Sequence, residues 1–329
     1  MDAAEALLEI ASLLERERAS RYRAKAFRQA AAVVASLPAD VLDDPARLQA
    51  QKGIGASTFA VIRQAREGRV PDYLVELRGE VEPERTSALR AQLRGDLHSH
   101  TDWSDGTTPI DAMVAAARAL GHEYLAITDH SPRLKVARGL SAERLREQIP
   151  LVRAQSGDGL TVLAGIEVDI LEDGGLDQTP EMLDALDIVV ASVHSKLRME
   201  SGPMTRRMLA AVADPHVNVL GHCTGRLVEG SRGTRPQSQF DARAVFAACA
   251  ENGVAVEINS RPERQDPPDD LIEIALDEGC LFSIDSDAHA PGQLSLLDYG
   301  AERAEAAGVP AERIVTTWGL ERLRAWARG

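Results

Sequence analysis

The chain has 329 residues, enough for one large and one small domain, and its 44% hydrophobic and 27% charged content is typical of a globular protein. A formal net charge of −14 excludes a protein whose whole surface binds nucleic acid. No apolar run is long enough to predict a membrane span, and the acidic N-terminus lacks the basic start of a signal peptide, so we expect a cytoplasmic protein.

Three cysteines, Cys223, Cys249 and Cys280, are not spaced in pairs, which predicts free thiols in a reducing compartment. Cys223 directly follows His222. Two interpretations of Cys223 stay open at this stage: a metal ligand, or a small residue packed beside a strand end.

Residues 1–78 read as a small helical domain. Apolar residues at helical spacing predict a helix over 3–14, and an alanine-rich helix over 23–37 is ended by Pro38. A turn containing Gly53 and Gly55 precedes an amphipathic stretch that runs to Arg66. A glycine-hydrophobic-glycine turn allows the backbone to approach an anion at the start of the next helix.

A charged and polar stretch with Pro83, residues 79–92, is predicted to be a linker. The part of the chain before residue 93 is nearly neutral, so the acidity of the chain comes almost entirely from residues 93–329.

From residue 93 onward, short apolar runs alternate with helical patterns. The runs cover 93–97, 124–128, 161–166, 188–193, 217–221, 254–258 and 281–285. The helical patterns cover 109–120, 142–155, 203–213, 242–252 and 269–278. Continuous apolar strands that alternate with helices predict a parallel sheet, and seven such units favour a closed barrel over an open sheet.

Histidine or an acid stands at or just after the end of nearly every run. The set is His98, His100, Asp105, His130, Glu167, His194, His222, Asp287 and His289. Imidazole and carboxylate are metal ligands, and strand ends that face one way are where α/β barrels build their sites. Nine ligands are too many for one tetrahedral zinc ion, but they suit two or three ions with a bridging carboxylate.

Other polar residues near the strand ends have weaker signals. Candidates for contact with substrate phosphate are Ser131, Lys135, Arg138 and Arg261, the last of which follows the one strand without a ligand. Asp129 adjoins a ligand and is expected to orient an imidazole. His122 and His216 lie in connecting segments and are expected to be exposed.

These residues resemble the polymerase and histidinol phosphatase (PHP) family over about residues 94–329. The shared motifs are His98-x-His100 with Ser104-Asp105-Gly106, Thr128-Asp129-His130-Ser131, Gly165-Ile166-Glu167, Ser192-Val193-His194, Gly221-His222 and Asp287-Ala288-His289. The resemblance implies a distorted (β/α)7 barrel, which agrees with the seven runs. It also implies one ion held by His98, His100, Glu167 and Asp287, a second by Glu167, His194 and His222, and a third by Asp105, His130 and His289.

The stretch 128–140 and the helical segment together resemble the two ends of bacterial family X DNA polymerases, a PHP domain and a helix-hairpin-helix domain. The resemblance implies DNA contacts in the helical domain, for which the candidates are Arg23, Lys25, Lys52, Gly53 and Gly55. There is no room for a polymerase palm before the barrel, so nucleotidyl transfer is not expected. Lyase-competent relatives carry lysines where this chain has Ser57 and Val61, so Schiff-base chemistry is not expected either.

The leading functional hypothesis is a phosphoesterase in which metal-activated water attacks phosphorus, acting on DNA 3′ ends as an exonuclease or in 3′-end processing during DNA repair. The expected cofactors are two to three divalent ions, zinc or manganese, with iron as an alternative. A small-molecule phosphatase of the histidinol phosphatase type stays open. So does a non-catalytic DNA-binding or scaffold protein whose barrel is structural. For the helical segment alone, a protein–protein module is a separate alternative. The sequence does not define the oligomeric state.

Overall fold

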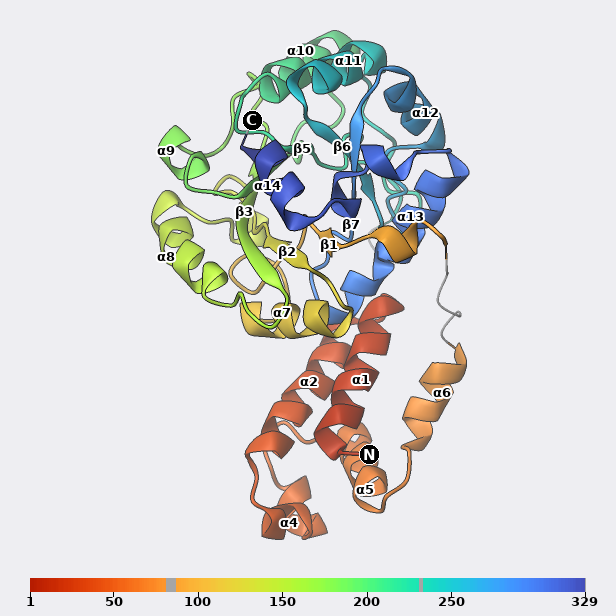
Figure 1. Cartoon of the computed structure of the whole chain (residues 1–329). Coiled ribbons are helices and arrows are strands. Elements are labelled where there is room, and N and C mark those ends of the chain that lie inside the picture. Colours follow the sequence, from red (N-terminus) through yellow and green to blue (C-terminus); the bar gives the residue numbers. More distant parts are fainter. Residues whose placement is uncertain (81–86, 231–232, 329) are drawn as a thin grey trace. The chain divides into compact units, whose positions relative to one another are not determined.

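The structure is a computed structural model that describes residues 1–80, 87–230 and 233–328 (Figure 1). The chain divides into two compact units. The first, a helical unit, contains Met1–Glu84 together with Ala290–Gln293. The second, a barrel unit, contains Arg85–His289 and Leu294–Gly329.

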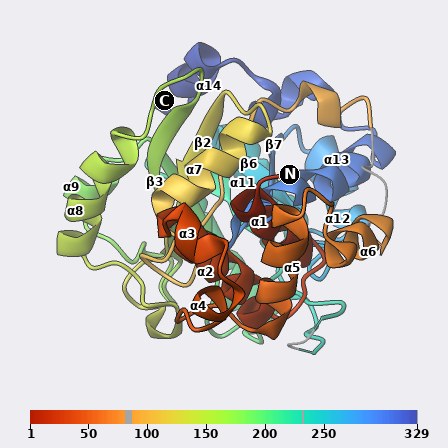
Figure 2. The same ribbon diagram turned by 90° about the horizontal axis from the view of Figure 1, so that it is seen from below.

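The helical unit is built on an antiparallel helix pair. Its helices are α1 Ala3–Arg16, α2 Arg21–Ser36, α3 Ala39–Leu42, α4 Pro45–Gln49, α5 Ala56–Arg66 and α6 Asp72–Glu80. Asp2 caps α1 by accepting hydrogen bonds from the first-turn amides of Ala4 and Glu5. Leu7 and Ile10 on α1 are fully buried in the same apolar cluster as Phe27 on α2, and the two figures show α1, α2 and α5 side by side (Figures 1 and 2).

The glycine turn before α5 has the geometry that its sequence predicts. Gly53 has a φ of +98°, a left-handed conformation that favours glycine. The Thr58 hydroxyl accepts a hydrogen bond from the Gly55 amide at 2.9 Å and so closes the start of α5. Helix α5 then runs to Arg66, as the amphipathic pattern predicts.

Seven parallel strands in sequential order form the sheet of the barrel unit. They are β1 Gly95–Asp96, β2 Tyr124–Ile127, β3 Thr161–Asp169, β4 Ile188–Ser192, β5 Val219–Leu220, β6 Ala255–Asn259 and β7 Leu281–Asp285. A parallel bridge between Ser99 and Ala288 joins the two edges just beyond β1 and β7. The sheet is therefore a nearly closed barrel, and the predicted fold class is confirmed.

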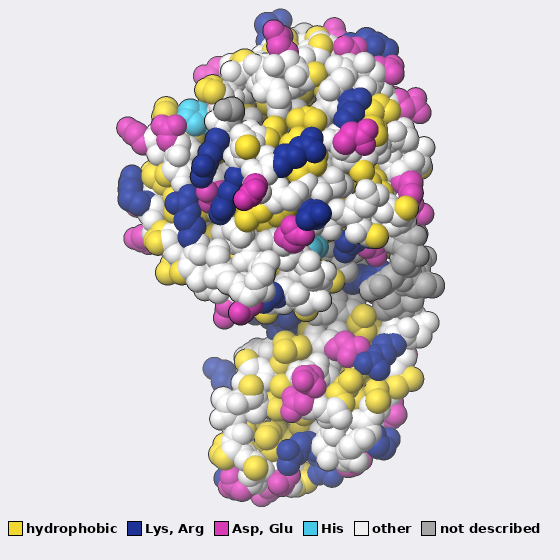
Figure 3. Space-filling view, in the orientation of Figure 1, with side chains coloured by type: hydrophobic (Ala, Val, Ile, Leu, Met, Phe, Trp, Pro, Cys, Tyr) yellow, Lys and Arg dark blue, Asp and Glu magenta, His cyan; other side chains and the backbone are white. Residues whose placement is uncertain are grey.

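Helices surround this sheet. They are α7 Ile110–Ala119, α8 Ala142–Arg153, α9 Pro180–Leu183, α10 Ser201–Val212, α11 Ala242–Asn252, α12 Asp269–Asp277, α13 Leu297–Ala306 and α14 Leu320–Ala327. The five helices predicted from periodicity match α7, α8, α10, α11 and α12 to within two residues at each end. The acidic and basic side chains of the chain are interspersed on the face shown in Figure 3.

The amino ends of the strands are closed by an apolar core inside the barrel. Its strand residues are Tyr124, Ala126, Leu163, Ile188, Val190, Val219 and Ala255. Val315, Trp318 and Leu323 from the C-terminal segment belong to the same cluster. The carbonyl of Thr316 accepts a hydrogen bond from the amide of Arg94, just before β1, which ties that segment to the barrel. Polar chemistry is therefore confined to the opposite, carboxyl ends of the strands.

The predicted linker is ordered at both of its described ends. Helix α6 extends to Glu80, and the 3₁₀ turn η1, Arg90–Gln92, follows Leu89, which is buried in the core of the barrel. Burial of the apolar Leu89 side chain in the barrel core is favourable and orders this end of the stretch. The charged composition of the stretch did not predict this packing.

The prediction that His122 and His216 are exposed is wrong. The chain turns from α7 into β2 at Gly121, and His122 is covered there, 4% exposed. Burial and the nearby Arg90 lower the pKa of His122 to about 4. His216 is half-buried and lies between the carboxylates of Asp214 and Asp184, with its ring nitrogens at 2.7 and 3.1 Å from them.

Candidate metal centre

Glu167 lies at the middle of the candidate centre. It faces the barrel interior because side chains alternate along β3 and Leu163, four residues earlier, faces the interior core. Gly165 stands between them, where a Cβ atom would lie 2.7 Å from the carbonyl oxygen of Ile188. A side chain would not fit at this level of the barrel, so Gly165 lets the neighbouring strands pack closely two residues before Glu167.

Five imidazoles from the ends of four strands surround this carboxylate. Glu167 Oε1 lies 2.8 Å from His222 Nε2 and 3.1 Å from His194 Nε2. Glu167 Oε2 lies 2.8 Å from His130 Nδ1 and 3.3 Å from His98 Nε2, with His100 Nε2 at 3.5 Å. Both oxygens thus face ring nitrogens on different sides, as a bridging ligand requires.

Two further predicted acids complete the cluster, the partly exposed Asp105 and the buried Asp287. Asp105 Oδ1 lies 3.4 Å from His130 Nε2 and 3.3 Å from His289 Nε2. Asp287 Oδ1 lies 3.5 Å from His100 Nε2 and 3.4 Å from His289 Nδ1. The Asp105 side chain is 36% exposed, whereas Glu167 is 1% exposed, so the centre opens to solvent at Asp105.

All nine predicted ligands fall into overlapping groups whose donor atoms lie within 4.8 Å of one another. The groups are His100, Asp105, His130 and His289; His98, His100 and Asp287; His98, Glu167 and His222; and His130, Glu167 and His194. Glu167 belongs to two groups and His100 to two, so neighbouring sites share ligands. The arrangement accommodates more than one cation.

Buried polar atoms without hydrogen bonds support the fit to metal ions. Both Glu167 oxygens, Nε2 of His98 and of His194, and both ring nitrogens of His100 are buried and make no hydrogen bond of normal geometry within the described structure, although each Glu167 oxygen lies 2.8 Å from a ring nitrogen. Such atoms normally find a partner, because leaving one unsatisfied costs about 1–3 kcal/mol. Imidazole nitrogens and carboxylate oxygens that converge in this way are the donor set of zinc, manganese or iron.

The electrostatics of the protein atoms are dominated by the central carboxylate. Burial alone would raise the pKa of Glu167, but the imidazoles around it, His194 and His98 first, hold this pKa well below its usual range. Burial alone would lower the pKa of His130, but Glu167 and Asp105 outweigh it and raise the pKa to about 10. Burial and neighbouring His289 lower the pKa of His100 to about 3. The site stabilises positive charge next to Glu167 and disfavours it at His100.

Comparison with known proteins adds a family to this geometry. A family model described as a PHP domain matches residues 96–261, which is half of the chain. This chain belongs to the PHP family. A second model, described as a helix-hairpin-helix domain, matches residues 1–69 and so confirms the predicted nature of the helical unit.

Similar proteins include enzymes that act on phosphoester bonds. A DNA polymerase/3′-5′ exonuclease, PolX of Bacillus subtilis strain 168, is 34% identical over 239 residues, which are 72% of this chain and 41% of that protein. The probable phosphatase YcdX of Escherichia coli K12 is 28% identical over 231 residues, 67% of this chain and 88% of the relative. The chain therefore spans about two fifths of the length of the Bacillus relative.

A solved structure is also similar: histidinol phosphate phosphatase from Lactococcus lactis, complexed with zinc, L-histidinol and phosphate. It has a TM-score of 0.48 and 19% identity, and the match covers 65% of this chain and 94% of that one. The family and its relatives confirm that the PHP barrel is a hydrolase acting on phosphoric ester bonds.

The prediction that Asp129 orients an imidazole is wrong. Its carboxylate accepts hydrogen bonds from the Thr101 amide and hydroxyl at 2.8 and 2.6 Å, and from the hydroxyl of Ser104 and the amide of Gln148 at 2.5 Å each. Because the side chain points toward the loop after His100, it fixes the segment that carries Asp105. The position of Asp129 next to His130 in the sequence did not predict the direction in which its side chain points.

Two carboxylates that are not among the predicted ligands, Glu257 and Asp169, contact imidazoles of the centre. The sequence did not predict this role for either of them. Glu257 Oε1 lies 2.6 Å from His98 Nδ1, and Asp169 Oδ1 lies 3.5 Å from His194 Nδ1. The available signal was an acid inside an otherwise apolar strand pattern, since such an acid needs a buried partner.

The four candidates for phosphate contact separate into two pairs. Lys135 and Arg138 are exposed on the loop that follows His130, and Gly139 holds this loop close, since a Cβ there would lie 1.8 Å from the Ser131 carbonyl oxygen. Ser131 is buried and its hydroxyl accepts a hydrogen bond from the Asp169 amide. Arg261 is 9% exposed and donates to Glu263 and to the Asp287 carbonyl oxygen. Of the four candidates, only Lys135 and Arg138 face solvent.

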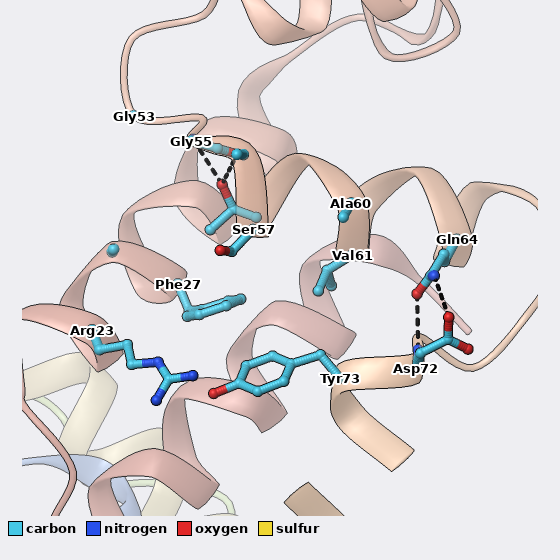
Figure 4. Close-up of a pocket in the computed structure, with 13 residues that line it drawn as sticks. Arg23, Phe27, Gly53, Gly55, Ser57, Ala60, Val61, Gln64, Asp72 and Tyr73 are labelled. Atoms are coloured by element: carbon cyan, nitrogen blue, oxygen red, sulfur yellow. Dashed lines mark hydrogen bonds between the residues drawn. The ribbon is translucent and has the colours of Figure 1, made fainter. Parts of the chain in front are cut away.

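The helical unit contains a pocket of about 510 Å³ beside the glycine turn (Figure 4). Arg23, Gly53 and Gly55 line it, together with Phe27 and Tyr73, and the Arg23 guanidinium lies 5.2 Å from the Tyr73 ring centre. Lys25 and Lys52 are exposed and are not among its lining residues. Ser57 and Val61 both line the pocket, as Figure 4 shows.

The other sequence predictions concern cysteines and membrane spans. All three cysteines are free, and Cys223 is buried outside the ligand groups, with its sulfur 3.9 Å from Asp266, so it is a packed residue. Among the described residues, no helix is long and apolar enough to cross a membrane.

Proposed function

We propose that the PHP barrel hydrolyses phosphodiester bonds at DNA 3′ ends, as an exonuclease or end-processing enzyme, with two or three divalent ions. The observation that carries the catalytic part is the group of unsatisfied donor atoms around Glu167. Six of the nine candidate ligands have buried nitrogens or oxygens without hydrogen bonds, which would be a costly way to stabilise a core and argues against a non-catalytic scaffold.

The proposed ligand sets follow the family pattern and the observed distances. One ion is assigned to His98, His100, Glu167 and Asp287; a second to Glu167, His194 and His222; and a third to Asp105, His130 and His289. When bound, such ions lower the pKa of water and neutralise phosphoryl oxygens. Zinc and manganese suit these ligands, and iron is an alternative.

The protein's own contribution is to orient the donors and to shape access. Glu167 and His98 are buried, whereas Asp105 and His289 lie on the open side, so a substrate phosphate approaches across the third ligand group. The Thr101–Ser104 contacts to Asp129 keep the Asp105 segment in place during that approach.

Support for a nucleic acid substrate comes from exposed basic residues at the carboxyl ends of the strands. Arg133, Lys135 and Arg138 are exposed on the loop after β2, and Lys196 and Arg198 on the loop after β4. Exposed basic residues on these two loops of an acidic chain favour contact with a polyanionic ligand. The helix-hairpin-helix match and the exonuclease name of the Bacillus relative point the same way.

The Escherichia coli relative favours a second candidate, a small-molecule phosphatase, since its name is probable phosphatase and the match covers 88% of its length. The test compares the full chain, loaded with zinc or manganese, on 3′-recessed duplex DNA, histidinol phosphate and a chromogenic phosphoester. Turnover of DNA with a kcat/KM well above that of histidinol phosphate supports the proposal. The reverse preference contradicts it, and inactivity on all three with metal bound would favour the scaffold hypothesis.

A further inference from the structure

Strand β6 is the one strand of the described barrel that supplies no predicted metal ligand. Its interior face nevertheless carries two polar side chains, because Ala255 lies in the interior core and the alternation along the strand turns Glu257 and Asn259 the same way. Glu257 is 0% exposed and Asn259 is 1% exposed. Polar groups buried this deeply need specific partners.

The Glu257 carboxylate is held by three donors. Oε1 lies 2.6 Å from Nδ1 of His98, and Oε2 accepts the backbone amide of His222 at 2.5 Å and the Asn259 amide at 3.1 Å. These contacts connect β6 to the end of its neighbour β5 and to the end of β1, the edge strand of the sheet order. The groups of candidate ligand atoms do not include Glu257.

The contact with His98 determines which ring nitrogen is available. A proton on Nδ1 that is donated to Glu257 leaves a lone pair on Nε2, and Nε2 is the nitrogen that faces Glu167 at 3.3 Å. A carboxylate that accepts the far N–H of a metal-binding imidazole fixes both its tautomer and its orientation.

Asn259 extends this support to Asp287. Its amide donates to Asp287 Oδ2 at 3.2 Å, and Arg264 Nε donates to the same oxygen at 3.1 Å. The Asp287 backbone has a φ of +50°, a conformation that non-glycine residues adopt only when their surroundings hold it. Oδ2 is thereby occupied, and Oδ1 remains directed at His100 and His289.

We propose that β6 is a positioning strand, in which Glu257 and Asn259 hold His98, His222 and Asp287 in the orientation that binds metal without binding metal themselves. The inference rests on the proposed metal centre. The proposed role explains why β6, which supplies no ligand, has buried polar side chains on its interior face: these side chains hydrogen-bond to ligand residues of other strands.

Glu257→Gln is the informative variant because it keeps the size of the side chain. A glutamine amide presents one acceptor and one donor, so it does not accept from both His98 and the His222 amide. Asp285→Asn is a matched control: Asp285 is also fully buried on the interior side, and its Oδ1 accepts the Leu97 backbone amide rather than an imidazole.

The experiment measures zinc and cobalt(II) binding to the full-length chain by elemental analysis and chelator competition, together with the visible spectrum of the cobalt form. We expect Glu257→Gln to weaken binding of at least one ion by about 10–100-fold and to shift the cobalt spectrum. Asp285→Asn should keep both metal affinity and spectrum. Thermal unfolding of the metal-free proteins measures any general loss of stability separately.

The outcomes separate the inference from the proposal on which it rests. If the wild-type chain binds neither zinc nor cobalt, the metal centre itself is wrong. If the wild type binds them and Glu257→Gln matches it in affinity and spectrum, β6 has no positioning role. Equal losses in Asp285→Asn would also overturn it, by showing a general effect of replacing a buried carboxyl group. Should Glu257→Gln not fold, Asn259→Ala carries the test, with an expected loss of about fivefold for one hydrogen bond to Asp287.

Discussion

At the mouth of the barrel, the carboxylate of Glu167 and the imidazoles around it are buried with nitrogens and oxygens that make no hydrogen bond. In the pocket of the helical unit, by contrast, Gln64 bonds to both the backbone and the side chain of Asp72, at 2.8 and 2.7 Å, and Thr58 bonds to Gly55. Both sites contain polar residues, but the barrel site leaves a converging group of carboxylate oxygens and ring nitrogens without hydrogen bonds, whereas the described lining of the pocket leaves only the Tyr73 hydroxyl.

This difference assigns different tasks to the two units. An unsatisfied buried polar atom costs about 1–3 kcal/mol, so folding retains a whole group of them only where something outside the protein's own atoms satisfies them. A pocket whose polar groups, apart from the Tyr73 hydroxyl, do not converge as unsatisfied ligand atoms binds by shape, aromatic surface and the charge of Arg23. We therefore expect chemistry at the barrel and recognition at the helical unit.

Removal of metal is expected to have the largest effect and to act on one unit only. The purified chain should contain two to three divalent ions, and complete chelation should abolish phosphoester hydrolysis until zinc or manganese is restored. DNA binding by the chelated full-length chain should stay within about twofold, because the helical unit needs no ion. Elemental analysis after dialysis measures the metal content, and fluorescence anisotropy measures DNA binding. A content of less than one ion per chain would refute the metal cluster.

Metal uptake should also depend on pH in a defined direction. The metal-free site holds His130 protonated at neutral pH, since its pKa is raised to about 10, and that proton must leave before the ring binds an ion. Affinity should therefore rise as pH increases toward 10, and calorimetry in buffers of different ionisation enthalpy should detect proton release. Uptake without proton release at pH 7 would contradict the charge state assigned to His130.

Glu167→Gln should lower hydrolysis by at least about a hundredfold, more than any change to a ligand at the edge of the centre. The amide keeps the shape of the side chain but loses the charge that two neighbouring groups share. Asp105→Asn is the comparison, since Asp105 belongs to one group and is partly exposed. The measurement is steady-state kinetics on a chromogenic phosphoester, with metal content determined on the same samples. If Glu167→Gln kept near wild-type rates, Glu167 would not bridge two ions.

A truncated protein that begins at Arg85 should separate recognition from chemistry. This start retains Leu89, which packs in the barrel core. We expect unchanged turnover of the small chromogenic ester and at least about a tenfold lower kcat/KM on DNA, mainly through weaker, salt-sensitive binding. Equal processing of DNA by the truncated and full-length chains would shift the proposal to a small-molecule phosphatase.

The smallest expected effect is the absence of a covalent adduct. Borohydride treatment of the full-length chain with abasic DNA should trap nothing above background, because a Schiff base needs an amine and the described lining of the pocket has Ser57 and Val61 rather than lysine. Gel analysis would detect any trapped adduct, and peptide mapping would identify the modified residue. An adduct at Lys25 or Lys52 would show that the helical unit also performs chemistry.

Much of the barrel follows from local patterns. Apolar runs of about five residues between helical segments can bury both faces only in a parallel sheet, and the helices predicted over 142–155 and 242–252 match α8 and α11 closely. Parallel strands place their carboxyl ends at one edge, so the sequence predicts that His130 and His194, 64 positions apart, lie close together.

The sequence by itself determined the order of elements, the end of the barrel that carries chemistry, and the residue types gathered there, because alternation and strand direction are local properties. Only the tertiary structure decided the direction of Asp129, the burial of His122 and Ser131, and the contact of Glu257 with His98 across 159 positions. Those outcomes depend on which side chains face each other once the sheet curves and its edges meet. No periodicity along one strand encodes the identity of the group on the opposite wall.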